Sequence, residues 1–316
     1  MKRRLAGAIA AALLCGCVTV QAQSDLVDIP INGTRVFPES ITSDAAGNLY
    51  NSSGNGTIYR TVPGGRSAEP WILPNAENGL TSLFGVFADE RHGTLWACDN
   101  PTFGATPSPN AASSVKGFDL KTGRFQTSYD FPVGKPAACN DIAVAADGAL
   151  WVSETASGRI FLLPEGGKAL VLFAEAPELV GIDGLAFSGD GTLYINNVRQ
   201  NLLQRVNRKA DGSYAGLTTL TLNDTLSGPD GLRSIGGNRF LQAEGQGGRV
   251  ALIEVSGDSA TVTPLKTGIE SSPGVTRVGK IGYVTEGKIN YMMDPALRGK
   301  DPGVFTIRAF ALPDNL

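Results

Sequence analysis

Four residues with oxygen-bearing side chains occupy equivalent positions in an internally repeated sequence. They are Glu39, Asn140, Asp183 and Asp230. Carboxylates held close together raise one another's pKa unless a cation binds between them. Carboxylate and amide oxygens, without histidine or thiolate, favour calcium over zinc, with magnesium or manganese as alternatives. The residue types therefore predict a divalent-metal site with calcium as its cation.

Each of these residues also has a purely local interpretation. Asp-Gly and Asn-Asp pairs form turns, and their side chains often hydrogen-bond the nearby backbone. A turn explains any one residue, but four residues in the same phase of four repeats favour a shared site. Glu39 is the most telling, because a glutamate between Pro38 and Ser40 offers little as a turn residue.

A repeat of about 45 residues must position these side chains. Each copy has a short apolar segment, an Asp- and Gly-rich turn, a second segment with an aromatic residue, and a third segment. Such turns account for the 40 glycines among 316 residues. The six ring positions that begin the copies are Glu39, Gly85, Asn140, Asp183, Asp230 and Gly274. Their even distance from the aromatic residues predicts that they lie near one end of a common axis.

Short strands in repeats of this length are typical of propeller blades. The sequence predicts an all-β fold, a six-bladed β-propeller, and a single domain over residues 23–316, because no linker separates the repeats. The third strand of the sixth blade is expected at 288–291. Either 26–31 or 304–311 could add an outer strand to a terminal blade, and we expect the N-terminal segment to close the ring.

Residues 1–22 have the pattern of a bacterial export signal. Three basic residues precede an apolar run over 5–14, which is far shorter than the roughly 20 residues that span a bilayer. Cleavage after Ala22 gives a periplasmic or secreted protein without a transmembrane segment. In the alternative, a lipoprotein signal over 1–16 leaves Cys17 acylated and the protein anchored at the outer membrane.

Charge and cysteine content narrow the class of partner. The chain has 27 Lys+Arg and 30 Asp+Glu without a basic cluster, which argues against nucleic acid. After export, Cys98 and Cys139 lie in an oxidising compartment, where we expect a disulfide, with two buried thiols as the alternative. The single histidine, His92, argues against a His-based triad or a zinc site.

The order and spacing of several short motifs resemble the gluconolactonase/regucalcin (senescence marker protein) family. These motifs are Pro38-Glu39, Asn140-Asp141, Asp147-Gly148, Asp183-Gly184-Leu185-Ala186-Phe187 and Pro229-Asp230-Gly231-Leu232. The resemblance covers most of the chain. It implies a six-bladed propeller with a catalytic divalent metal, usually calcium, that hydrolyses sugar lactones or related esters.

The resemblance also implies a role for each ring residue. Glu39, Asp183 and Asp230 correspond to the metal ligands, Asn140 to the polar residue that contacts the substrate, and Asp230 also to the general base. The family usually has asparagine where this chain has Asp183. We expect the added charge to tighten cation binding and to weaken the metal as a Lewis acid, with a carboxylate that stays protonated as the alternative.

The second segments of the repeats should end on the same face as the ring. Their last polar residues are Asp99, Asn100, Glu154, Asn196, Asn197, Glu244 and Glu286. This pattern predicts an acidic rim in which Glu154 and Asn197 contact substrate, with ordinary solvated strand ends as the alternative. The insertion at 102–112 is the largest candidate for a specificity loop.

These features predict an exported, metal-dependent lactonase or esterase that acts on a small molecule. The metal polarises the carbonyl, and a carboxylate takes a proton from the attacking water. A non-catalytic propeller of the cell envelope, which binds a ligand or protein and keeps a structural metal, is the alternative. Other propeller chemistry, such as phosphotriester hydrolysis or a lyase, is a third reading, because a fold by itself fixes no reaction.

Overall fold

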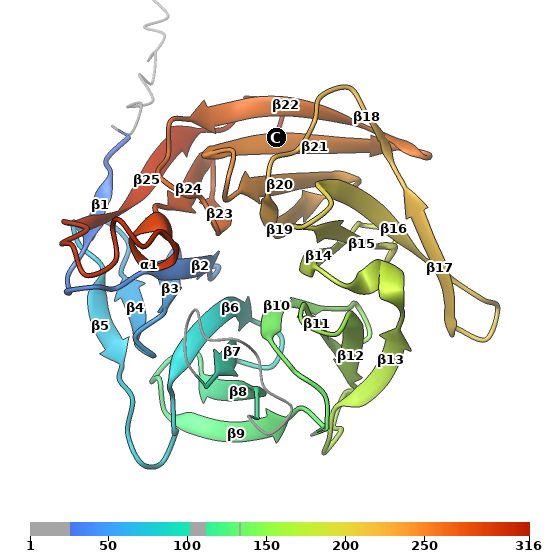
Figure 1. The fold of residues 1–316 in the computed structure, drawn as a ribbon, viewed down its shortest axis with the longest axis horizontal. Coiled ribbons are helices and arrows are strands. Elements are labelled where there is room, and N and C mark those ends of the chain that lie inside the picture. Colours follow the sequence, from blue (N-terminus) through green and yellow to red (C-terminus); the bar gives the residue numbers. More distant parts are fainter. Residues whose placement is uncertain (1–25, 102–111, 133) are drawn as a thin grey trace, which may run out of the picture.

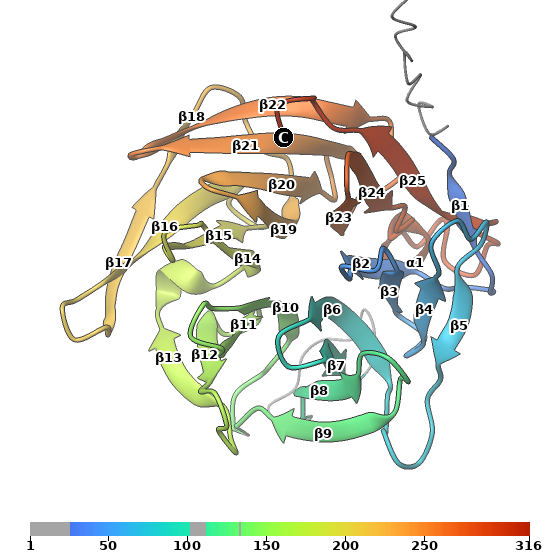
Figure 2. The same ribbon diagram turned by 180° about the vertical axis from the view of Figure 1, so that it is seen from behind.

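The computed structural model describes residues 26–101, 112–132 and 134–316. Six sheets surround a central axis in the order of the sequence (Figures 1 and 2), which confirms the all-β, six-bladed propeller. The leader at 1–22 and nearly all of the insertion at 102–112 lie outside the described residues, so export and the division into domains stay predictions. No described helix is long and apolar enough to cross a membrane.

Each blade is named here from its strand nearest the axis outward. Blade 1 has β2 (Pro38–Ser43), β3 (Leu49–Ser53), β4 (Ile58–Thr61) and β5 (Glu69–Ile72). Blade 2 has β6 (Ser82–Asp89), β7 (Thr94–Asn100), β8 (Ser114–Asp119) and β9 (Phe125–Asp130). Blade 3 has β10 (Cys139–Val144), β11 (Leu150–Glu154), β12 (Arg159–Leu163) and β13 (Val171–Glu175).

The other three blades follow the same plan with small additions. Blade 4 has β14 (Ile182–Phe187), β15 (Leu193–Asn197), β16 (Leu202–Arg208) and β17 (Tyr214–Thr219), preceded by the 3-10 helix η1 (Pro177–Leu179). Blade 5 has β19 (Pro229–Gly236), β20 (Arg239–Glu244), β21 (Arg249–Ser256), β22 (Ser259–Thr267) and β18 (Thr221–Leu222). Blade 6 has β23 (Val275–Val278), β24 (Ile281–Thr285), β25 (Phe305–Ala311) and β1 (Ile29–Ile31), with the helix α1 (Asn290–Met293) before β25.

The hydrophobic core is divided into six clusters, and each cluster lies between two neighbouring blades. Alternating residues of the strands supply them, since successive side chains of a strand point to opposite faces of its sheet. Both faces of every blade are therefore covered. The aromatic residue of each repeat belongs to this core, as Tyr50 in blade 1 and Phe240 in blade 5 illustrate.

The two chain ends close the ring within blade 6. β1 is its outermost strand and pairs antiparallel with β25, with Ile29 opposite Ile307, so closure by the N-terminal segment is confirmed. The expected third strand at 288–291 is wrong. That segment turns through Lys288, which has a left-handed φ of 49°, and enters α1, while β25 supplies the third strand.

A bulge interrupts the innermost strand of five blades. In each bulge two consecutive residues have no partner in the ladder between the first and second strands. The first residues of the bulges are Glu39, Phe84, Asn140, Asp183 and Asp230. The second ring position is therefore Phe84, and the assignment of Gly85 was one residue out.

The sixth ring position needs the same correction. The amide of Gly274 donates to the Thr285 hydroxyl of the second strand at 3.1 Å, as the amide of the second bulge residue Ser40 does to Ser52 Oγ at 3.0 Å. Gly274 thus corresponds to Ser40, and Pro273 is the ring residue. Two of the six ring positions are apolar.

Close packing explains the glycines that follow the ring positions. A Cβ on Gly274 would lie 2.7 Å from the Cα of Ser40 in the next blade, and a Cβ on Gly231 would lie 2.8 Å from the carbonyl of Pro273. Neighbouring inner strands can approach this closely only where no side chain intervenes. The Asp-Gly pairs of blades 4 and 5 therefore reflect contact between blades as well as local backbone geometry.

Candidate metal and substrate site

The bulges bring the four polar ring residues to one end of the axis. Glu39, Asn140 and Asp183 are buried, and Asp230 is half-buried. A bulge re-aims a side chain that would otherwise follow the alternation of its strand. Polar groups from the second strands fix the bulges, as when the Asp141 amide donates to Ser153 Oγ at 2.9 Å and the Gly184 amide to Asn196 Oδ1 at 2.9 Å.

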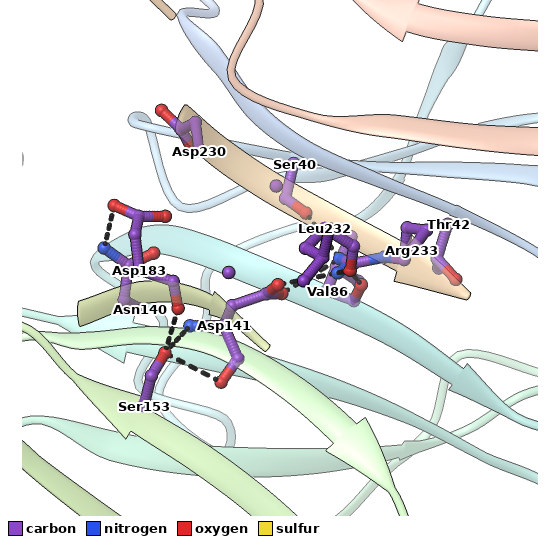
Figure 3. A network of polar contacts seen from close by, with 12 residues as sticks. Ser40, Thr42, Val86, Asn140, Asp141, Ser153, Asp183, Asp230, Leu232 and Arg233 are labelled. Carbon is purple, nitrogen blue, oxygen red and sulfur yellow. Dashed lines mark hydrogen bonds and ion pairs between the residues drawn. The ribbon is translucent and has the colours of Figure 1, made fainter. Parts of the chain in front are cut away.

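A direct hydrogen bond joins blades 3 and 4 within this group. Asn140 Nδ2 donates to Asp183 Oδ2 at 2.9 Å and to Thr155 Oγ1 at 2.8 Å, and Figure 3 shows Asn140 and Asp183 side by side. Both amide protons are thus engaged. The Asn140 carbonyl oxygen remains as the group that can accept from a substrate hydroxyl or ligate a cation.

Burial and mutual repulsion dominate the electrostatics of the three carboxylates. Burial, followed by the charges of Asp183 and Asp141, raises the pKa of Glu39 well above its ordinary value. Burial, followed by Asp141, raises the pKa of Asp183 to about 7. The pKa of Asp230 is raised well above its ordinary value by burial and by the charges of Asp183 and Glu39. Without a cation, this cluster holds protons at neutral pH.

The donor set fits a hard divalent cation. Asp183 Oδ1 is buried and receives no hydrogen bond within the described part of the chain, so it lacks the partner that a buried carboxylate oxygen requires. Among the described residues no three acidic, histidine or cysteine side chains already converge on one metal position. A cation would have to draw Glu39, Asp183 and Asp230 together, with oxygen ligands only.

An ion pair that the sequence analysis missed lies below this cluster. Arg233 of β19 binds the Asp141 carboxylate through Nη1 to Oδ2 at 2.6 Å and Nη2 to Oδ1 at 2.9 Å (Figure 3). Nη2 also donates to Ser40 Oγ at 3.2 Å and to the Val86 carbonyl at 3.3 Å. Arg233 therefore connects blades 5, 3, 1 and 2 at the axis. Its charge also opposes the rise in the pKa of Glu39 and Asp183.

The structure does not bring Glu154 and Asn197 to the carboxylate cluster. The fully buried Glu154 accepts from Arg159 Nε at 2.8 Å and from the amides of Ala138 and Ala156. Asn197 Oδ1 caps the hairpin after β15, accepting from the amides of Arg199 and Gln200. Both side chains stabilise strand ends, so the contacts expected with substrate are replaced by internal ones.

The rim is also less acidic than the sequence suggests. Glu244 pairs with Arg249 Nε at 2.5 Å, and Glu286 pairs with Arg308 Nη2 at 3.0 Å. Each arginine neutralises a glutamate at the end of the second strand, as Arg159 does for Glu154. The charge available to a ligand is therefore concentrated at the ring.

Cys98 and Cys139 form the expected disulfide between blades 2 and 3, with their Cα atoms 5.2 Å apart. Cys98 of β7 is equivalent in position to Ser52 of β3 and Ser153 of β11. Those two serines hydrogen-bond the bulges of their own blades. Cys139 immediately precedes the ring residue Asn140, so the disulfide fixes the start of β10. His92 lies between β6 and β7, at the other end of these strands from the ring, with Nδ1 2.7 Å from Asp89 Oδ2.

Comparison with known proteins agrees with this architecture. Residues 23–61 match the family model described as strictosidine synthase-like, N-terminal. No curated protein matches the chain. The matched segment contains β2, β3 and β4 of blade 1, with the ring residue Glu39, and ends before β5.

Solved structures of three differently named proteins share the fold. A gluconolactonase from Xanthomonas campestris is 17% identical, with 87% of each chain covered and a TM-score of 0.63. Regucalcin from Agrobacterium tumefaciens is 17% identical over 91% of this chain and 98% of its own, with a TM-score of 0.57. Virginiamycin B lyase from Staphylococcus aureus is 16% identical over 91% and 99%, with a TM-score of 0.59. The chain therefore has the six-bladed propeller fold of gluconolactonase and regucalcin, which agrees with the family resemblance of its motifs.

Proposed function

We propose that this protein is an exported, divalent-metal-dependent hydrolase of sugar lactones or related esters. The observation that carries the proposal is the set of three mutually repelling carboxylates, on the buried Glu39 and Asp183 and the half-buried Asp230, beside an amide on Asn140. Perturbed acid groups gathered at one site are typical of catalytic centres. Calcium is the cation we propose, because every ligand atom is an oxygen.

The chain's own residues have distinct tasks in this proposal. Glu39, Asp183 and Asp230 would hold the cation, which when bound would polarise the lactone carbonyl and stabilise its developing negative charge. Asn140 orients Asp183 through their hydrogen bond and offers its carbonyl oxygen to a substrate hydroxyl. Asp230, the least buried of the three acids, takes a proton from the attacking water.

Proton transfer then completes the reaction without a covalent bond between enzyme and substrate. The water oxygen bonds to the carbonyl carbon, and the bond from that carbon to the ring oxygen breaks. Asp230 returns its proton to the departing alkoxide, so the products are a carboxylic acid and a free hydroxyl. A catalytic histidine is not needed.

The lyase reading is not favoured. One solved relative in fold is a catalytically inactive histidine-to-alanine variant of virginiamycin B lyase, at 15% identity. The single histidine of this chain, His92, lies at the turn after β6, at the opposite end of the inner strands from Glu39 and Asn140. It therefore could not serve a reaction at the ring.

Hydrolysis of a panel of sugar and aliphatic lactones, followed with a pH indicator, tests the proposal. We expect turnover in excess calcium, loss of turnover with a chelator, and loss in Asp230→Ala. Asp211→Ala is the matched control, because Asp211 is an exposed acid in the turn before β17 of blade 4. A folded protein that binds calcium but hydrolyses no lactone would instead support a non-catalytic binding propeller with a structural metal.

A further inference from the structure

A cavity lies at the opposite end of the inner strands from the carboxylate cluster. Its volume is about 240 Å³. The inner strands of blades 1, 2, 5 and 6 line it with Thr42, Ser43, Phe87, Ala88, Arg233, Ser234, Ile235, Thr276 and Arg277. The lining contains two arginines and four hydroxyl groups but no carboxylate, so hydrogen-bond donors and positive charge predominate.

Arg233 lines this cavity and has one unsatisfied donor. Its Nη atoms bind Asp141, Ser40 and Val86 on the side of the carboxylate cluster. Its Nε is buried and has no hydrogen-bond partner among the described residues, and the residue as a whole is 8% exposed. Figure 3 shows Thr42, a lining residue, beside Arg233. A buried guanidinium N–H without an acceptor is costly, and an anion in the cavity would supply one.

Arg277 provides the second positive charge. Its side chain is half-buried on β23 and forms no ion pair with any residue in the described ranges. Its backbone carbonyl is held by Ser43 Oγ at 2.8 Å, and Ser43 also contacts Thr276 Oγ1 at 3.0 Å. These contacts fix the backbone of β23 and leave the guanidinium available to a ligand.

Hydroxyl groups complete the donor set. Thr42 Oγ1 accepts from the Ala88 amide at 3.2 Å. The hydroxyl proton of Thr42 has no acceptor among the described residues and is available to a ligand. Ser234 is exposed, and its side chain forms no hydrogen bond within the described part of the chain. The cavity thus offers donors from three strands to one small acceptor.

We propose that this cavity binds a small oxyanion, either a carboxylate or a phosphate group, between Arg277 and the Nε of Arg233. Guanidinium groups match the planar or tetrahedral oxygens of such anions, and charge-assisted hydrogen bonds are the strong ones. Asp141 already neutralises Arg233, so Arg277 carries the net charge that attracts the ligand. The proposal does not depend on the hydrolase function.

Calorimetric titration of the full protein with inorganic phosphate, and separately with acetate, tests this site without added divalent cation. We expect one saturable site for at least one anion, and a loss of affinity of about tenfold or more in Arg277→Gln, since hydrogen bonds to charged groups are of that strength. The Arg277 side chain forms no ion pair or hydrogen bond with any described residue, so this variant should fold. Binding of phosphate alone, acetate alone or both identifies the source of the oxyanion.

Two further variants separate the cavity from general attraction to charge. Ser234→Trp leaves the charge unchanged but fills the cavity, and it should abolish binding. Arg124→Gln removes an exposed arginine before β9, away from the cavity, and should bind as the unaltered protein does. The proposal would be overturned if neither anion bound saturably. It would also be overturned if Arg277→Gln and Arg124→Gln lost anion affinity to the same extent.

Discussion

Arg233 on blade 5 and Asp141 on blade 3 form a two-point ion pair that bypasses blade 4. The two contacts measure 2.6 and 2.9 Å, and both side chains are almost completely buried. Burying two charges is favourable only when they are well paired, so loss of one partner leaves an uncompensated charge at the axis. The pair therefore fixes the inner strands beneath the carboxylate cluster.

Replacement of Arg233 by methionine should lower the free energy of unfolding by about 3 kcal/mol or more, because Asp141 is then buried without a partner. Urea unfolding followed by circular dichroism measures this. The double variant Arg233→Met with Asp141→Asn should recover part of the loss. Arg239→Met is the control, because it removes a half-buried arginine of the same blade that donates only to the Asn315 carbonyl, at 2.9 Å, and pairs with no carboxylate among the described residues. Equal stability of Arg233→Met and Arg239→Met would contradict the role given to the pair.

Glu154 offers a test of structure against substrate binding. Its carboxylate is fully buried and pairs with Arg159 at 2.8 Å. Glu154→Gln should cost about 3 kcal/mol of stability by leaving Arg159 unpaired, and should leave KM of any lactone unchanged. Thermal unfolding and initial-rate kinetics at a temperature where both proteins are folded decide this. A raised KM with unchanged stability would restore Glu154 as a substrate contact.

The His92–Asp89 contact should make stability depend on pH. The hydrogen bond that His92 Nδ1 donates to the Asp89 carboxylate raises the pKa of His92 above its ordinary value of 6.5. A raised folded-state pKa adds stability that is fully present below the unfolded value and is lost as pH rises through the folded value. The difference in Tm between the unaltered protein and His92→Gln should therefore be larger at pH 5.5 than at pH 8.5. A difference that grows with pH would contradict this sign.

The phase of the repeat made much of the fold and site predictable. Six blades and four polar ring residues follow from positions that recur along the chain. Closure by the N-terminal strand follows from the alternating pattern over 26–31, and the disulfide from two cysteines that export would place in an oxidising compartment. The ring assignments to Gly85 and Gly274 were each one residue out, because the residues that occupy these two ring positions, Phe84 and Pro273, are apolar and do not mark the ring as a carboxylate or amide does.

Contacts between blades that are not neighbours could not be predicted from the sequence. Arg233 and Asp141 are 92 residues apart, and neither the period nor a motif links them. The sequence offered one indication of this pair, which is a single arginine within the apolar inner segment of blade 5. Both faces of an inner strand are packed against neighbouring blades, so a charged side chain there is expected to lie at the axis. The pair of Glu154 and Arg159 was more accessible, since Glu244 and Arg249 repeat the same five-residue spacing.

Cation binding should be coupled to proton release. Burial and neighbouring charges raise the pKa of Asp183 to about 7, and that of Asp230 is also raised. A cation displaces the protons that these groups retain, so calcium affinity should increase as pH rises through 7. Calorimetric titration in two buffers of different ionisation enthalpy measures the protons released. Affinity that is constant between pH 5.5 and 8.5 would show that the carboxylates are already ionised.

Asp183→Asn tests the charge that distinguishes this chain from the family pattern. The variant removes one negative charge and keeps an oxygen ligand, so calcium should bind more weakly at pH 8, while turnover stays the same or increases because the metal becomes a stronger Lewis acid. At pH 5.5, where Asp183 is largely protonated, the two proteins should bind calcium with similar affinity. Calorimetry at both pH values, with lactone hydrolysis in saturating calcium, measures each effect. Tighter calcium binding by the variant at pH 8 would contradict the role given to Asp183, because a ligand cannot lose its charge and gain affinity for a cation through electrostatics.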